Sequence, residues 1–317
     1  MSELTKSKSK TEELKDEAYL KAPPPKKPWS KIIFQAILIL LVLGWAFNGS
    51  KFNIPELISG AGPLANIIGR MNPPDFHKMG DPEHYSIPEG LTSLDLVLPI
   101  PLSEEKSKQK NKWWNNQFPQ TIIGATIQTI QMALAGTFIA LIFALPISFL
   151  AARNTTPHPL IYRFVRMLLN LFRTIPDLAL GLIFVSAVGL GAFAGTLALA
   201  FHTTTVLAKL LSESIEGIDE GVVEAVKATG ANYLQTLSFA VIPQVLPDII
   251  SFGLYRFETN IRSAAVLGLI GAGGMGYLMN NAFRTFAYKE ACAIVVILMV
   301  LVISVDSVSA KLRKMAI

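Results

Sequence analysis

Charged residues are scarce in this chain of 317 residues. Only 16% of the residues are Asp, Glu, Lys or Arg, whereas 51% are hydrophobic. Soluble domains usually carry about 25% charged residues. The deficit is uneven, because long stretches after Ile32 are almost free of charge while the first 31 residues are rich in lysine. This distribution excludes disorder over most of the length, argues against an ordinary soluble enzyme, and predicts a polytopic membrane protein.

Metal-binding and nucleotide-binding patterns are also lacking. Cys292 is the single cysteine, so no internal disulfide can form and a cysteine-based zinc site has too few thiolates. His77, His84, His158 and His202 follow no recognised metal-ligand spacing, and no G-x-x-x-x-G-K-S/T phosphate loop occurs. We therefore expect no metal and no cofactor in this chain. The net charge of +5 indicates no nucleic-acid partner, because basic cytoplasmic loops give the same sign.

The apolar stretches predict an all-α fold, a polytopic membrane helical bundle with about six transmembrane helices. We divide the chain into a cytoplasmic lysine-rich tail (1–31), a first transmembrane helix (32–47), an external loop region (48–119) and a transmembrane domain (120–317). A cleaved signal peptide is the rival interpretation of 32–47. The polar region before it is too long for that, and no small-x-small cleavage site follows.

The remaining spans follow from length and charge. They are expected at 121–152, twice within 178–211, at 247–270 and at 291–308. The 34 residues of 178–211, in which Lys209 is the only charge, exceed one span of about 20, so two spans would share them, turn at the central glycines and each extend into its flank. The loop after residue 152 is rich in arginine and the C-terminal tail is basic, which predicts that both lie in the cytoplasm. With six spans, the N-terminus then lies there as well.

The polar stretch 219–243, between the fourth and fifth spans, is the most informative part of the sequence. Asp219 can cap a first helix, and Gly230 is placed to end it in the left-handed conformation. Asn232, with Gln235 three residues later, predicts the cap of a second helix. Two short capped helices on the cytoplasmic face indicate a docking surface, since a plain linker would not need such definition.

This stretch resembles the EAA loop of ABC importer permeases. Glu224 and Ala225 are followed by Gly230 and by Pro243 at that family's spacing, and Pro243 and Pro247 are expected to mark the start of the fifth span. An unrelated pair of loop helices is the alternative interpretation. The resemblance implies that the loop docks on separate ATPase subunits, and it assigns this coupling to Glu224, Ala225, Lys227, Gly230, Asn232 and Pro243.

The stretches RTIPDLALGLIFV (173–185) and YRFETNIRSAAVLGLIGAGGMG (255–276) resemble the phosphonate-importer permeases in particular. The resemblance covers roughly residues 120–315. It implies a pathway for phosphonates or related phosphorus oxyanions in a bacterial plasma (inner) membrane. The implied partners are two ATP-binding subunits, which hold ATP and Mg, an external substrate-binding protein, a second copy of this chain as a homodimer, and membrane lipid. The chain itself would not be an enzyme.

The fifth span carries Arg256, Glu258 and Arg262. Three central charges cost roughly 8 to 10 kcal/mol on an insertion scale, whereas the apolar residues of this span return only about 3 to 6 kcal/mol. The helix therefore needs protein partners or a water-filled cavity. These residues are candidates for contacting an anionic substrate. Alternatively, Glu258 and Arg262, four residues apart, neutralise each other and hold the bundle together.

Three other functional interpretations fit the sequence less well. The G-x-G-x-x-G at 271–276 would indicate a dinucleotide site only after a strand and before a helix, and the apolar surroundings argue against that. An ion-coupled secondary transporter of a small anion would explain the charges of the fifth span, but it would not need the capped cytoplasmic helices. A membrane-embedded enzyme lacks paired carboxylates or a nucleophile–base spacing within the spans.

Overall fold

The computed structural model describes residues 29–51, 53–76, 87–92, 95, 101–114 and 118–316. The regular structure in these residues is entirely helical, which confirms the all-α prediction. The chain divides into two compact units, 1–65 and 66–317. Nearly all of the lysine-rich tail, together with His77 and His84, lies outside the described residues.

The first unit contains α2 (Trp29–Gly49) and most of α3 (Ile54–Met71), which runs on into the second unit. The helix α2 extends beyond the predicted 32–47 at both ends. Its large apolar side chains from Ile33 to Phe47 are exposed, as expected for a helix that borders lipid. The helix α3 contains Pro63 and lies at 51° to α2.

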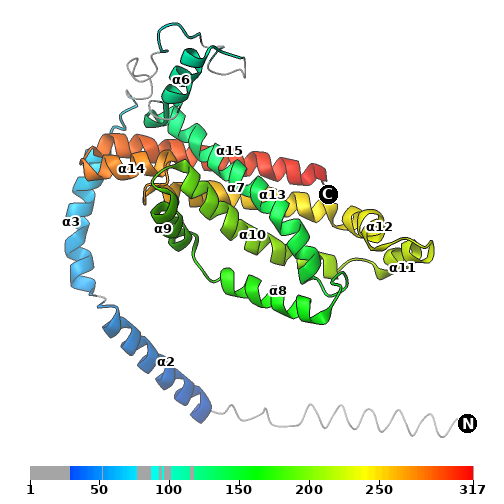
Figure 1. Cartoon of the computed structure of the whole chain (residues 1–317). Helices are drawn as coiled ribbons and strands as arrows, with labels where there is room; N and C mark the ends of the chain where they lie inside the picture. The colour runs from blue at the N-terminus through cyan, green and yellow to red at the C-terminus, as the bar shows by residue number, and fades with distance from the viewer. Residues whose placement is uncertain are drawn as a thin grey trace, which may run out of the picture. The chain divides into compact units, whose positions relative to one another are not determined.

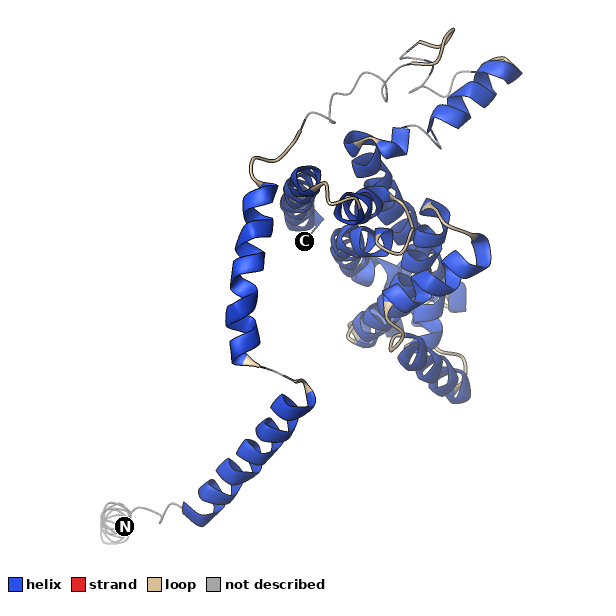
Figure 2. Cartoon of the chain, turned by 90° about the vertical axis from the view of Figure 1, so that its left-hand side faces the viewer, coloured by secondary structure: helices blue, strands red, loops and turns tan. Residues whose placement is uncertain are grey.

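Within the described part of the second unit, four helices are long and apolar enough to cross a membrane. They are α7 (Ile122–Ala151), α10 (Ala192–Glu216), the continuous helix Tyr233–Gly268 and α15 (Tyr288–Ala316). Figures 1 and 2 show them side by side in one bundle. Small residues allow close packing of α7 on α10: a Cβ added at Gly136 would lie 2.9 Å from the Cβ of Leu199.

The third span was predicted in the first half of 178–211, and α9 (Asp177–Val188) lies there. It is preceded by α8 (Pro159–Phe172), and the two helices meet at 86°. Pro176 causes the break, because it cannot continue a helix and disfavours the helical conformation of the residue before it. The 12 residues of α9 span only about 18 Å. The predicted glycine turn is confirmed, since Gly189 and Gly191 have positive φ and join α9 to α10.

The fifth span starts earlier than predicted. The segments α12 (Tyr233–Thr236), η4 (Leu237–Val241) and α13 (Ile242–Gly268) form one helix of 36 residues, so Pro243 and Pro247 do not interrupt it. The reason is that η4 is a π-helical turn placed just before Pro243. Its i→i+5 pattern accommodates the missing N–H of a proline one turn later.

Shorter helices close the bundle at both ends. At one end, α6 (Glu104–Lys112) and η3 (Phe118–Gln120) precede α7, and α14 (Gly274–Arg284) connects α13 to α15. At the other end lie α11 (Glu220–Ala228) and α12, near the end of α15 (Figure 1). The loop around α11 and the glycine-rich segment before α14 therefore occupy opposite ends of the bundle.

Candidate functional site

The helix α11 has the local structure that the sequence predicted. The side chain of Asp219 caps it by accepting a hydrogen bond from the Gly221 N–H (2.8 Å), and Gly230 follows it with φ +84°. Asn232 and Gln235 form a reciprocal capping box at the start of α12, with bonds of 2.8 and 2.9 Å. These caps fix a sharp change of direction between α11 and α12.

Specific contacts tie α11 and α12 to the long helices. The side chain of Gln244 on α13 accepts a hydrogen bond from the Asp219 N–H (2.9 Å) and donates one to the Ala240 carbonyl (2.8 Å). The Tyr233 hydroxyl donates to the Thr155 carbonyl just beyond α7 (2.7 Å). Val223 packs on an apolar cluster formed by Ala152, Ile215, Leu237, Val241 and Val245. A displacement of α11 would therefore be transmitted to α13.

Most residues of α11 are exposed. Glu224, Ala225 and Lys227 are exposed, and Val222 is 41% exposed. A cavity of about 220 Å³ lies between this helix and the turn after α7, and Glu224 and Lys227 line it. An exposed apolar residue among charged neighbours, on a helix with both ends capped, suits a surface that docks on another protein. Pro243 is exposed too, but it lies on α13.

The charged residues of α13 separate into two groups. Glu258 and Arg262 form the predicted ion pair one turn apart, and both also reach α15: Glu258 lies 3.4 Å from Arg313, and Arg262 lies 3.6 Å from Asp306. Glu258 is mostly buried. This network joins α13 to α15, which favours the bundle-stabilising interpretation for Glu258.

The exposed part of α13 is polar only in its middle. Tyr255 is 46% exposed and the Arg262 side chain 47%, and Ser251 and Thr259 are half-buried on the same face. Nearer the helix ends the exposed residues are apolar: Leu246, Ile250, Val266 and Leu269. The opposite face is mainly apolar and is buried against the bundle. A polar face in the middle of a membrane-crossing helix borders water or another protein subunit, because lipid cannot solvate it.

Arg256 forms the second group. It points away from the ion-pair network, as the sequence indicated, and interacts electrostatically with Asp177 at the start of α9. His202 on α10 interacts with both of them. Neither Asp177 nor His202 was predicted from the sequence as a site residue. The available signal was His202 itself, since an ionisable residue inside an apolar helix is a functional candidate by default.

The glycine-rich segment before α14 serves packing. Gly271, Gly273 and Gly274 have positive φ. The first N–H groups of α14 donate hydrogen bonds to side chains of α7. The Gln128 side chain accepts from the Gly274 N–H (2.7 Å), and the Thr129 hydroxyl accepts from the Met275 N–H (3.0 Å). The segment follows the helix α13, with no strand in the described residues before it, so the context of a dinucleotide site is missing.

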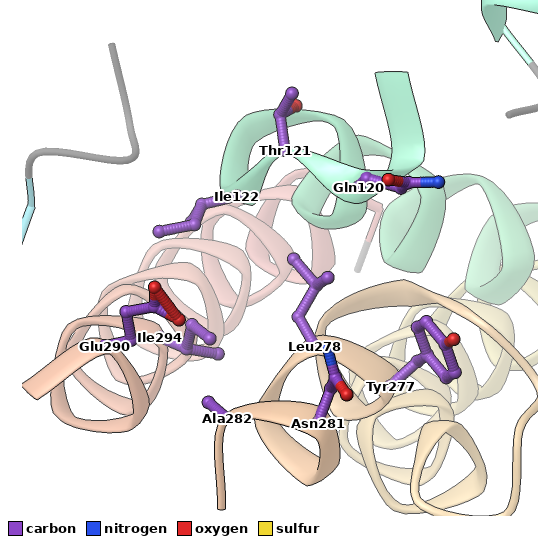
Figure 3. Close-up of a pocket in the computed structure, with 9 residues that line it drawn as sticks. All are labelled: Gln120, Thr121, Ile122, Tyr277, Leu278, Asn281, Ala282, Glu290 and Ile294. Atoms are coloured by element: carbon purple, nitrogen blue, oxygen red, sulfur yellow. The ribbon is translucent and has the colours of Figure 1, made fainter. Parts of the chain in front are cut away.

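A cavity of about 310 Å³ opens at the same end, between α14 and the first residues of α7 and α15. Figure 3 shows Gln120, Tyr277, Asn281 and Glu290 around it, together with apolar residues such as Leu278. The lining is mainly polar and contains no cluster of metal ligands among the described residues.

The model of the family "Binding-protein-dependent transport system inner membrane component" matches residues 144–314. The chain belongs to this family. The family is described as an inner membrane component, and the membrane-crossing helices of this chain agree with that description.

Relatives agree with this membership, and a solved structure shares the fold. The chain is 45% identical over 188 residues to the phosphite transport system permease protein PtxC of Stutzerimonas stutzeri, covering 59% of this chain and 68% of that protein. It is 39% identical over 196 residues to the phosphate-import permease protein PhnE of Mycolicibacterium smegmatis, covering 62% of this chain and 37% of that protein. An inward-facing structure of the MetNI methionine ABC transporter shares the fold, with a TM-score of 0.54, 22% identity, and coverage of 61% of this chain and 94% of that one.

Proposed function

We propose that this chain is the permease subunit of an ATP-driven importer and forms the transmembrane pathway for phosphonates or related phosphorus oxyanions. The observation that carries the proposal is the exposed helix α11, joined through Gln244 to a membrane-crossing helix with exposed polar residues in its middle. The family, and the phosphite and phosphate transport named for the two relatives, support the substrate class.

The proposed assembly contains two copies of this chain as a homodimer and two ATP-binding subunits that dock on α11. ATP and Mg are held by those subunits, and this chain hydrolyses nothing. A substrate-binding protein delivers the anion at the opposite end, where α14 lies. The end that carries α11 faces the cytoplasm, as do both termini, in the plasma membrane of a bacterium.

In this mechanism, ATP binding draws the two ATPase subunits together and moves α11. The hydrogen bonds of Gln244 and the Val223 contact carry that motion into α13. The polar residues in the middle of α13 in the two copies border the pathway, since ionisable residues within membrane spans usually face the bundle interior or a water-filled cavity. Alternation between outward and inward access is driven because ATP binds one of the two arrangements more tightly.

Charge reversal on the open side of α11 tests the coupling. We expect Glu224→Lys to lower both recovery of the ATPase subunit with the purified permease and ATP-driven uptake of methylphosphonate by roughly tenfold or more. The matched control is Glu213→Lys, because Glu213 is also an exposed acid but lies on α10 and not on α11. Normal recovery and uptake in Glu224→Lys would contradict the role of α11. Uptake that survives without the ATPase but collapses with the ion gradient would replace the proposal by an ion-coupled secondary transporter.

A further inference from the structure

A cavity of about 480 Å³ lies between α7, α8, α9 and α10. Its lining is apolar apart from Thr204 and Thr205, and the hydroxyls of both donate to carbonyls of α10 itself (2.7 Å each). Phe143 of α7 lines the cavity and is 58% exposed, so the cavity opens on the surface of the bundle. The cavity therefore suits an apolar chain that enters from the side.

A lysine lies at one edge of this cavity. Lys209 follows Thr205 by one turn of α10, on the side of α11, and its ammonium group donates to the side-chain oxygen of Asn170 on α8 (2.6 Å). Asn170 directly follows Leu169, which lines the cavity. This hydrogen bond places the ammonium group where α8 meets α10. Two of its three N–H donors have no partner among the described residues.

The positive charge at this edge is not neutralised by the part of the chain that the structure describes. Lys209 forms no ion pair there, not even with Glu213 one turn further along α10. Arg173, directly after α8, is exposed and forms no ion pair with a described residue either. By contrast, Arg166 of α8 is paired with Glu216 (3.2 Å). Basic pockets between membrane-crossing helices are typical binding sites for anionic lipid headgroups.

Lys209 also lies at a depth that suits a headgroup. The 25 residues of α10 extend about 38 Å, whereas the hydrocarbon core of a bilayer is about 30 Å thick. The helix is mainly apolar up to Ala208 and ends in the polar stretch 212–216. Lys209 stands at this boundary, and the cavity begins one turn away on the apolar side. A phospholipid can therefore place its phosphate at Lys209 and an acyl chain in the cavity.

We propose that the cavity and Lys209 bind one anionic phospholipid from the leaflet on the side of α11, with an acyl chain in the cavity and the phosphate at the ammonium group. The proposal does not depend on which anion the chain transports. A zwitterionic lipid carries the same phosphate, but its choline cation is repelled by Lys209 and Arg173. Phe172 and Phe184, on either side of the 86° bend between α8 and α9, both line the cavity, so the acyl chain packs against both helices.

The test measures apparent dissociation constants of lipids from the delipidated full-length protein in detergent, by native mass spectrometry. We expect phosphatidylglycerol to bind at least about fivefold more tightly than phosphatidylcholine with the same acyl chains. Lys209→Met should weaken phosphatidylglycerol binding by roughly fivefold to tenfold, and Lys209→Arg should retain it. Ala200→Leu, whose larger side chain fills part of the cavity, should weaken the binding of both lipids. Lys311→Met is the control and should change neither value, because Lys311 is an exposed lysine of α15 away from the cavity lining.

Equal binding of the two lipids, or unchanged binding in Lys209→Met or Ala200→Leu, overturns the proposal. Lys209→Gln guards against a folding defect, because its amide can still donate to Asn170 without the charge. It should lose the preference for phosphatidylglycerol, and a retained preference also overturns the proposal. Displacement of the lipid by excess inorganic phosphate would assign Lys209 to a soluble anion. Absence of bound lipid from the wild type would mean that another segment or a second copy covers the cavity, and both results reject the lipid site.

Discussion

The carboxylate of Glu258 on α13 lies 3.4 Å from the guanidinium of Arg313 on α15 and also accepts a hydrogen bond from Arg262, one turn along α13. Arg262 in turn lies 3.6 Å from Asp306 of α15. Two acids and two arginines thus alternate across the contact between two membrane-crossing helices. Such pairing is what allows charges to reside within a membrane-embedded bundle.

Removal of the central acid should loosen this contact. We expect Glu258→Ala to lower the free energy of unfolding in detergent by roughly 1 to 3 kcal/mol, because two arginines lose their shared acceptor. The measurement is thermal or denaturant unfolding of the purified permease, with Glu213→Ala on the exposed side of α10 as the control. Unchanged stability with lost uptake would assign Glu258 to the pathway.

A buried polar chain crosses the centre of the bundle. Thr203 of α10 donates to the Asn260 side chain, and Asn260 donates to the hydroxyl of Thr137 on α7 (2.8 Å). All three residues are buried. The chain joins three helices and leaves none of these side-chain groups without a partner, so it specifies how α7, α10 and α13 align.

Replacement of Asn260 should show how far the stability of the bundle depends on this hydrogen-bonded chain. We expect Asn260→Leu to cost about 1 to 3 kcal/mol of stability, because the Thr203 hydroxyl loses its acceptor while buried. The double variant Asn260→Leu with Thr203→Val should recover part of the loss. Thr204→Val is the control, since Thr204 bonds only to the carbonyl of its own helix. Additive losses in a double-mutant cycle would show that the two side chains are not coupled.

The glycines of α13 and α14 allow those two helices to touch. A Cβ added at Gly276 would lie 1.8 Å from the Ala265 carbonyl oxygen. We expect Gly276→Ala to destabilise the bundle by about 3 kcal/mol or more, because backbone must move to make room. Gly62→Ala on α3 is the control, since nothing lies within 4 Å of its added Cβ. The measurement is the yield and melting temperature of purified permease, and equal values for both variants would refute the close contact.

Features fixed within a few residues were predictable from the sequence. The cap at Asp219, the positive φ at Gly230 and the capping box at Asn232 all follow from local chemistry and were confirmed. The ion pair of Glu258 and Arg262 was predictable for the same reason, since four residues on a helix define it. Helix propensity and capping depend only on residues that are close in the sequence.

Features set by packing were not predictable. Pro176 breaks the third span, whereas Pro243 and Pro247 leave the fifth span continuous and Pro146 leaves α7 continuous, so a proline in the sequence does not by itself predict a break. The hydrogen-bond partners of Asn260 come from α7 and α10, far away in the sequence. A pattern of residues along one helix cannot show which side chains of other helices face it.

The turn at Gly230 offers the sharpest test of α11 as a coupling element. Its φ of +84° is strained for any residue with a Cβ, by roughly 1 to 2 kcal/mol, and least so for asparagine. We expect Gly230→Val to leave the melting temperature of the bundle nearly unchanged, because the turn is exposed and nothing lies within 4 Å of an added Cβ. The strain instead tilts α11 away from α12, so ATP-driven uptake should fall at least about fivefold, and Gly230→Asn should retain most of it.

Gly217→Ala is the matched control, because Gly217 has a φ of −93° and also follows a helix at this end of the bundle. Full uptake in Gly230→Val would mean that the angle between α11 and α12 does not matter to transport.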